Sequence, residues 1–110
     1  MAFAEKNIVR TQLGAVNATL YTVPASTTTV LKNIHLTNTS SSTKKVTLYL
    51  VDNGGSATDA NKLFHQVSVP GSGILEYCGW KVLDTPGDTI QGFADSASSV
   101  TIHVDGAEIS

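Results

Sequence analysis

Val46-Thr47-Leu48-Tyr49-Leu50-Val51 is the stretch that decides the fold. Its apolar residues recur at every second position, and successive side chains of a β-strand point to opposite faces of a sheet. We therefore expect Val46, Leu48 and Leu50 to face a core and Thr47 and Tyr49 to face outward. The stretch predicts a strand that is covered on one side.

A second segment, residues 30–36, alternates in the same way but carries one misplaced charge. Ile34 and Leu36 share one face with Val30, and Lys32 falls on that same face. A β-bulge or a strand start near Asn33 would resolve the conflict.

Six further segments have the pattern of strands, which makes eight in all. They lie at residues 8–13, 18–23, 63–69, 74–83, 89–94 and 100–104. Turn residues separate them: Asn53-Gly54-Gly55 and Asp105-Gly106 tolerate positive φ, and Pro70-Gly71 and Pro86-Gly87 join a fixed φ to a free one. One or two helical turns are expected at most, within residues 59–64. The pattern predicts a single all-β domain, an antiparallel β-sandwich of the jelly-roll or immunoglobulin-like kind.

Composition restricts the classes of function. The chain has 110 residues, of which 41% are apolar and 15% charged, and its formal net charge is −2. A disordered chain normally carries more charge, and nucleic-acid binding needs clustered cations that displace counterions from phosphates. Lys44-Lys45 is the only basic cluster, and we interpret it as a solvated loop flank. We therefore expect one folded domain and no nucleic acid among its partners.

The first 13 residues are less regular than the rest. We expect residues 1–13 to form an N-terminal arm or a first strand, and residues 14–110 to form the sandwich domain. The start lacks the basic and apolar regions of a secretory signal, and no stretch approaches the ~20 apolar residues of a membrane span. Synthesis in the cytosol without a membrane partner is the expectation.

The sequence contains no pattern that points to catalysis, a metal or a cofactor. Cys78, the only cysteine, lies in an apolar strand and is interpreted as buried filler. His35, His65 and His103 are far apart in sequence, and we place His35 and His103 at outward strand positions. Oxygens in the loop at 52–59 could in principle hold calcium, but the loop lacks the bidentate acid of an EF-hand. We expect a protein that is not an enzyme.

The aromatic residues are candidates for surface contacts. Tyr21 and Tyr49 are predicted to face outward, whereas Trp80 is assigned to the core or to a subunit interface. Sugar rings could stack on any of the three. A carbohydrate-binding module is therefore the alternative to a structural protein.

Four segments resemble those of small virion structural proteins of tailed bacteriophages. They are Tyr21-Thr22-Val23-Pro24-Ala25, the stretch at 31–39, the stretch at 46–51 and Gly87-Asp88-Thr89-Ile90-Gln91-Gly92. The resemblance runs over most of the chain from about Leu20 onward. It implies a virion protein made in the host cytoplasm, a capsid decoration or cement protein that binds across capsomer junctions, or a head-tail accessory protein.

The resemblance also sets expectations for partners. It implies contacts with the major capsid protein or other virion proteins, in a homo-oligomer for which a trimer is favoured. The alternative within the same resemblance is a tail or baseplate adsorption module that binds glycan. The candidate interface residues are Phe3, Ile8, Val9, Arg10, Leu13, Tyr21 and Tyr49.

Overall fold

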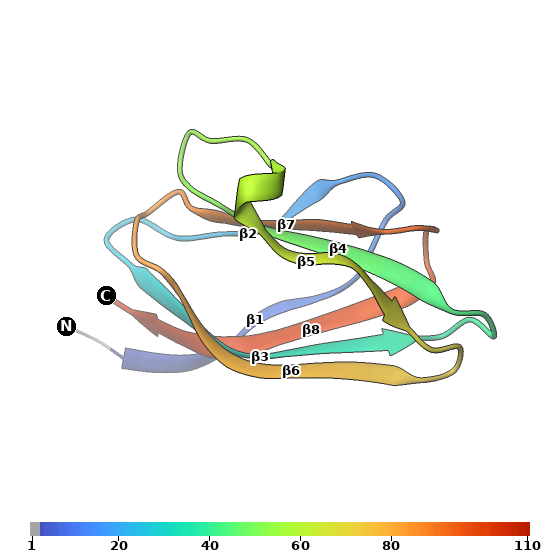
Figure 1. Ribbon diagram of the computed structural model, residues 1–110. Coiled ribbons are helices and arrows are strands. Elements are labelled where there is room, and N and C mark those ends of the chain that lie inside the picture. Colours follow the sequence, from blue (N-terminus) through green and yellow to red (C-terminus); the bar gives the residue numbers. More distant parts are fainter. Residues whose placement is uncertain (1–2) are drawn as a thin grey trace.

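Two antiparallel four-stranded sheets pack face to face and enclose the core (Figure 1). The computed structural model describes residues 3–110. Sheet 1 contains, in spatial order, β1 (Phe3–Gln12), β8 (Val100–Ile109), β3 (Thr28–Asn38) and β6 (Ile74–Leu83). Sheet 2 contains β2 (Ala18–Thr22), β7 (Thr89–Ala94), β4 (Lys44–Val51) and β5 (Lys62–Val69).

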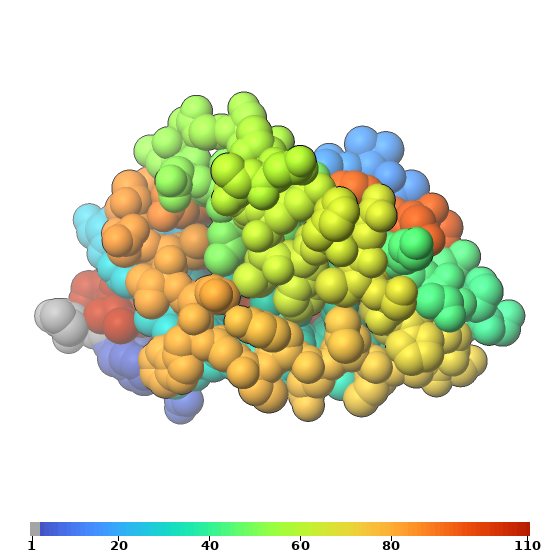
Figure 2. All heavy atoms as spheres, in the orientation of Figure 1, coloured from blue at the N-terminus to red at the C-terminus, as the bar shows by residue number. Residues whose placement is uncertain are grey.

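The strand orders 1-8-3-6 and 2-7-4-5 define a jelly roll. Every connection except the β4–β5 hairpin crosses from one sheet to the other. The predicted all-β sandwich is thereby confirmed, in its jelly-roll form. The segment between β4 and β5 stands out from the surface above sheet 2 (Figure 2).

The core comes from the alternation that the sequence displays. Val46 and Leu48 of β4 are fully buried as predicted, and Leu36 and Ile102 of sheet 1 are also fully buried. Each such side chain contributes about 2 kcal/mol to folding. Thr47 differs from the prediction, because it is only 3% exposed and its hydroxyl accepts a hydrogen bond from the Gln66 backbone at 3.3 Å.

The bulge expected near Asn33 is present. The register of β3 shifts between Leu31 and Asn33 against both of its neighbours, β6 and β8. The Lys32 side chain consequently reaches the outer side of sheet 1, where its ammonium lies between two exposed aromatic rings. Leu31 and Ile34 remain buried on either side of the shift.

The turn predicted at Asp105-Gly106 is wrong, since both residues lie inside β8. Gly106 is paired with Leu31 of β3, and a Cβ atom at Gly106 would overlap the carbonyl oxygen of Val30. The glycine therefore serves a close approach of two strands and not a change of chain direction. As a result, β8 continues to Ile109 and gives β1 a partner along its whole length.

Two buried polar side chains fasten the loops. Asn38, 1% exposed, donates to the carbonyl oxygens of Ser42 and Val69 at 2.8 and 3.0 Å and accepts from the Ser40 backbone at 2.9 Å. Asp88 accepts from the backbone N–H of Asn53 at 2.8 Å. Both ends of the sandwich are thus held by groups that satisfy backbone donors and acceptors away from water.

The helical content of the described residues is one short turn, η1 (Asp59–Asn61), as the sequence predicts. The side chain of Asn61 accepts a hydrogen bond from the Thr58 backbone at 3.0 Å and closes this turn. Within residues 3–110, no helix has the length and apolar character needed to cross a bilayer.

Candidate interaction surface

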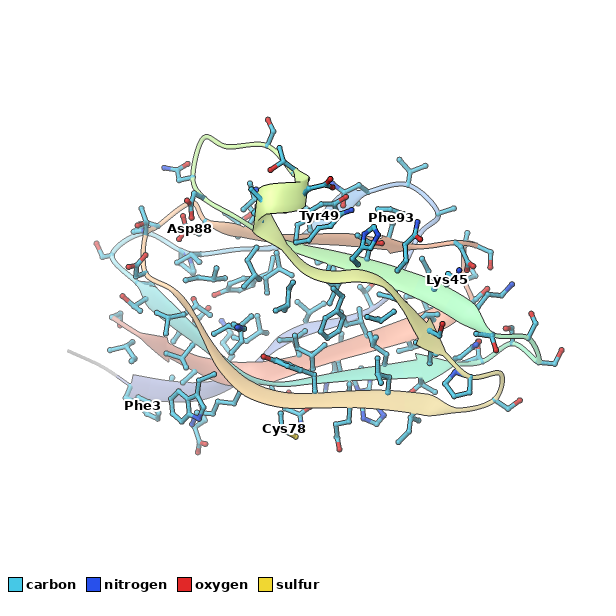
Figure 3. The ribbon with its side chains drawn as sticks, in the orientation of Figure 1. Phe3, Lys45, Tyr49, Cys78, Asp88 and Phe93 are labelled. Carbon is cyan, nitrogen blue, oxygen red and sulfur yellow. The ribbon has the colours of Figure 1, made fainter. Side chains whose placement is uncertain are left out.

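The outer face of sheet 1, the side turned away from sheet 2, is the candidate interaction surface, and we call it the outer face. Strand β6 alternates strictly, so that Leu75 and Tyr77 pack toward the core while Cys78 and Trp80 point outward. Figure 3 shows Phe3 and Cys78 on this side of the molecule. The outward side chains form a broad ordered surface on regular strands.

One end of the outer face is apolar. Trp80 is 70% exposed, Phe3 61% and Val82 57%, and the apolar residues on the strands between them, Val30 and Ala107, are buried. Large exposed apolar groups that lie together on one surface mark sites of interaction more often than scattered ones do. This end of the sheet therefore has the chemistry of a protein–protein contact.

Lys32 lies in the middle of the apolar end. Its ammonium is 5.5 Å from the ring centroid of Phe3 and 5.5 Å from that of Trp80, and 3.7 Å from the Glu5 carboxylate. Cation–π contacts at exposed sites contribute about 0.5–1 kcal/mol each. The three side chains hold one another in place on the surface.

A row of polar side chains crosses the centre of the outer face. The strand registers pair Arg10 with His103, His103 with His35, and His35 with Glu76. The two imidazole centroids are 6.4 Å apart, and Nδ1 of His35 lies 3.2 Å from the Glu76 carboxylate. The row runs from a cation on β1 to an anion on β6.

The two histidines were predicted to point outward, and they do, but no sequence pattern indicated that they would lie side by side. Metal binding requires further ligands around the ion. Among the described residues, no three histidine, cysteine or acidic side chains converge in that way. The pair therefore belongs to the polar row and carries no metal-site geometry.

A shallow hollow of about 390 Å³ lies beside the row, where β1 and β3 both change register next to β8. Arg10 and Lys32 line it together with Glu5 and Asp105. The lining thus contains both cations and carboxylates, together with Gly106. The hollow is an open surface depression of mixed charge, which suits contact with another charged surface.

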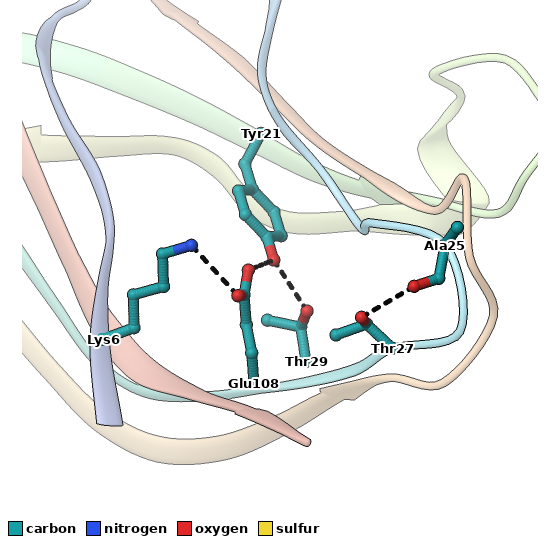
Figure 4. A network of polar contacts seen from close by, with 6 residues as sticks. All are labelled: Lys6, Tyr21, Ala25, Thr27, Thr29 and Glu108. Carbon is teal, nitrogen blue, oxygen red and sulfur yellow. Dashed lines mark hydrogen bonds and ion pairs between the residues drawn. The ribbon is translucent and has the colours of Figure 1, made fainter. Parts of the chain in front are cut away.

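A polar cluster inside the sandwich joins the two sheets at the same end (Figure 4). The Tyr21 hydroxyl donates to the Glu108 carboxylate and lies 2.8 Å from the Thr29 hydroxyl, and Lys6 donates to Glu108 at 3.0 Å. Burial, together with the hydrogen bond to Glu108, raises the pKa of Tyr21 to about 12. The hydrogen bond from Tyr21, with the nearby Lys6, holds the pKa of Glu108 below its usual value.

The residues expected to make contacts fall into two groups. Phe3 and Arg10 are exposed on the outer face. The other members of β1 and its loop pack into the core, at exposed fractions of 1 to 8%: Ile8, Val9 and Leu13. The register shift between Asn7 and Val9 leaves the neighbouring Ile8 and Val9 both buried, so that only Phe3 and Arg10 of these five are free to touch another molecule.

The aromatic residues lie in three different places. Tyr21 was predicted to face outward, but its hydroxyl reaches into the polar cluster between the sheets. Tyr49 lies half-buried on the outer side of sheet 2 with the Lys62 ammonium 6.0 Å from its ring centroid. Trp80 lies on the outer face instead of in the core. These three rings therefore do not form a common platform for sugar.

The prediction that Cys78 is buried is also wrong, because its side chain is exposed. The alternation of β6 indicates the correct direction. Glu76, Cys78 and Trp80 stand at every second position and must share one face of the strand. A charged Glu76 on that face indicates that all three point to solvent.

Comparison with known proteins gives a fold but no family. No family model matches the chain, and no curated protein is similar to it in sequence. A subunit from "Bacillus endospore appendages form a novel family of disulfide-linked pili" is similar in structure, with a TM-score of 0.60 and 12% identity over 99% of this chain and 88% of that one. A chain of infectious bursal disease virus, Gx strain, has a TM-score of 0.53 and 12% identity. This chain is covered to 98% in that match but spans only 33% of the viral chain. At such identities the likeness concerns the jelly-roll fold.

Proposed function

We propose that the chain is a structural subunit of a bacteriophage particle, and specifically a capsid decoration protein that binds across capsomer junctions. The observation that carries the proposal is the outer face, a wide and regular sheet surface with Phe3, Trp80 and Val82 exposed on it. Such a surface acts by covering another surface. Many copies, each burying area against neighbouring capsomers, would resist outward pressure on the shell.

The comparisons support an assembly role at the level of the fold. The similar structures come from a virus and from spore appendages that are described as pili. The appendage is described as disulfide-linked. These 110 residues hold a single thiol, Cys78, and a disulfide uses two, so this thiol could link chains only in pairs. Non-covalent contact on a particle is therefore a better interpretation than a disulfide-linked fibre.

The partners in this proposal are the major capsid protein and further copies of the chain. Both follow from the resemblance of the segments at 21–25, 31–39, 46–51 and 87–92 to phage virion proteins. The same resemblance favours a trimer, since decoration sites commonly lie at local three-fold axes. The charge pattern of the outer face favours a dimer instead.

The test is to purify phage particles from cells that express this protein and to analyse them by quantitative mass spectrometry and cryo-electron microscopy. We expect many copies per particle and extra density over capsomer junctions. Particles from which the gene has been deleted should lose that density and regain it when purified protein is added. Particles that never contain the protein, or that carry it only on the tail, would contradict the decoration role.

A further inference from the structure

The outer face has Arg10 at one edge and Glu76 at the other, and exposed apolar side chains at both of its ends: Phe3, Trp80 and Val82 at one end and Ile74 at the other. We propose that a second copy of this chain packs on the outer face, related to the first by a two-fold axis that runs parallel to the strands between β8 and β3. The inference concerns the free chain in solution and does not depend on the proposed particle role. A copy that binds capsomers through its outer face would first have to leave the dimer. The inference replaces the favoured trimer by a dimer.

The exposed apolar side chains need a partner that lies over the sheet. Phe3 lies on β1 and Trp80 and Val82 on β6, so they extend across the full width of the outer face. Adding another strand to an edge of sheet 1 would pair backbones and leave these side chains in water. Lys6 and Lys81, on the core-facing sides of the two edge strands, also oppose such addition.

The size of the outer face fits a dimer. Four strands spaced about 4.8 Å apart and about 33 Å long cover roughly 600 Å² of each copy in plan. Stable interfaces of standard size bury about 800 Å² per partner, and protruding side chains such as Trp80 add to the flat area. One face per copy is therefore enough.

This axis places charged side chains of one copy opposite side chains of the other copy that carry the opposite charge. The rotation lays β1 over β6 of the second copy and β8 over β3. Arg10 and Glu76, at opposite ends of the polar row, then face Glu76 and Arg10 of the second copy. Asp105 of β8 lies over Asn33 of β3 in the second copy, beside Lys32 at the register shift. The Arg10–Glu76 pairing occurs twice, and each Asp105 lies near a Lys32 of the other copy.

A two-fold axis that crosses the strands at the level of Asp105 brings like charges together. Such an axis would lay each strand on itself and place Asp105 on Asp105 and Lys32 on Lys32. Like charges facing each other across an interface are unfavourable. Under the proposed axis, by contrast, Arg10 and Glu76 lie opposite each other.

Charge reversal with rescue tests the proposal. By light scattering or sedimentation, the wild-type chain should have twice its 11.5 kDa mass, and Arg10→Glu and Glu76→Arg should each weaken association about 10- to 100-fold. The double variant Arg10→Glu/Glu76→Arg should restore the dimer. Both side chains are exposed, so circular dichroism should report an unchanged fold.

Mixing the two single variants is the sharper experiment. Each variant alone places like charges opposite each other. A mixed pair instead places the two substituted side chains, which have opposite charges, against each other, and native Arg10 against native Glu76. We therefore expect a heterodimer to form from two weakly associating proteins. A monomer or a trimer in the wild type, or failure of both the double variant and the mixture to associate, would overturn the proposal.

Cross-linking gives an independent readout. The axis places Asn7 of β1 near Cys78 of β6 in the second copy. The two residues lie at the same height along the strands, because Asn7 pairs with Asp105, Asp105 with Asn33, and Asn33 with Cys78. In Asn7→Cys, a bis-maleimide with an arm of about 10 Å, the spacing of packed sheets, should give a covalent dimer on a denaturing gel. Val16→Cys, exposed in the loop after β1, is the matched control and should give none. Equal cross-linking of both variants would contradict the arrangement.

Discussion

The hydroxyl of Tyr21, on β2, donates a hydrogen bond to the carboxylate of Glu108, on β8, and thereby joins the two sheets of the sandwich. The contact links residues that are 87 positions apart in the sequence. The contact joins the phenol of Tyr21, a weak acid, to the carboxyl group of Glu108, a stronger acid, in a site that is partly shielded from water. The stability of the fold should therefore respond to pH at both extremes.

Tyr21→Phe should lower the free energy of unfolding by about 1–2 kcal/mol at pH 7, because Glu108 loses a donor and Thr29 a partner. The folded pKa of Tyr21, about 12, lies above its ordinary value of 10.0. Its contribution to stability is therefore complete below pH 10 and is lost as the pH rises through 12. Urea unfolding from pH 7 to 12 should show this alkaline loss in the wild type and a smaller one in the variant.

Tyr49→Phe is the control for the loss of a hydroxyl. Tyr49 makes no side-chain hydrogen bond within the described residues, and we expect its variant to stay within about 0.5 kcal/mol of wild type and to retain the alkaline loss. Equal pH profiles of wild type and Tyr21→Phe would show that the contact with Glu108 does not contribute to stability.

Glu108→Gln should remove a stabilising response to acid. The pKa of Glu108 is held below its ordinary value by the hydrogen bond from Tyr21 and by Lys6. Its contribution is therefore present above the unfolded pKa of about 4.3 and is lost as the pH falls through the lower folded value. Thermal unfolding between pH 7 and 2 should fall less steeply in this variant than in wild type. Asp95→Asn, at an exposed carboxylate that makes no side-chain hydrogen bond or ion pair within the described residues, is the control and should keep the wild-type slope.

The strands could be predicted from the sequence because alternation is a local signal. The 46–51 stretch and the bulge at Asn33 needed only neighbouring residues to be interpreted. The pairing of strands could not be predicted, since β1 pairs with β8 from the other end of the chain. His35 and His103 become neighbours through that long-range register alone.

Side-chain direction was predicted less well than strand position. Tyr21 turns inward because Glu108, Thr29 and Lys6 offer it polar partners between the sheets, and no pattern near Tyr21 indicates them. Cys78 points outward because the alternation of β6 decides its direction, although cysteine as a residue type favours burial. The candidate surface therefore depends on how distant strands pair, which the sequence does not show. The class of fold could be predicted from the local alternation of apolar residues.

Asn38→Ala should be among the most destabilising single substitutions in the chain. The side chain is 1% exposed and fastens the 39–43 loop to β3 and β5 through Ser42, Val69 and Ser40. Removing it leaves buried backbone groups without partners, which costs about 2–4 kcal/mol in the free energy of unfolding. Urea denaturation measures the change. Asn17→Ala, which removes one exposed contact to Gln91, should cost no more than about 0.5 kcal/mol, and similar losses in both variants would contradict the anchoring role.

Gly106→Ala tests the closest approach of two strands in sheet 1. A methyl group at Gly106 would overlap the carbonyl oxygen of Val30, which belongs to the paired strand β3. The strands must separate or shift to admit it, and we expect a loss of about 2–4 kcal/mol in the free energy of unfolding. Hydrogen exchange should report faster opening of β8 and β3 than of the strands of sheet 2.

Gly14→Ala is the matched control, because a Cβ atom there would lie no closer than 3.8 Å to the atoms of Val16. We expect its free energy of unfolding to stay within about 0.5 kcal/mol of wild type. Since Gly106 has no positive φ, backbone strain cannot account for a large loss at that position. A Gly106→Ala protein as stable as Gly14→Ala would mean that β3 and β8 can move apart at little cost, and that the register shift beside Leu31 is not fixed by this glycine.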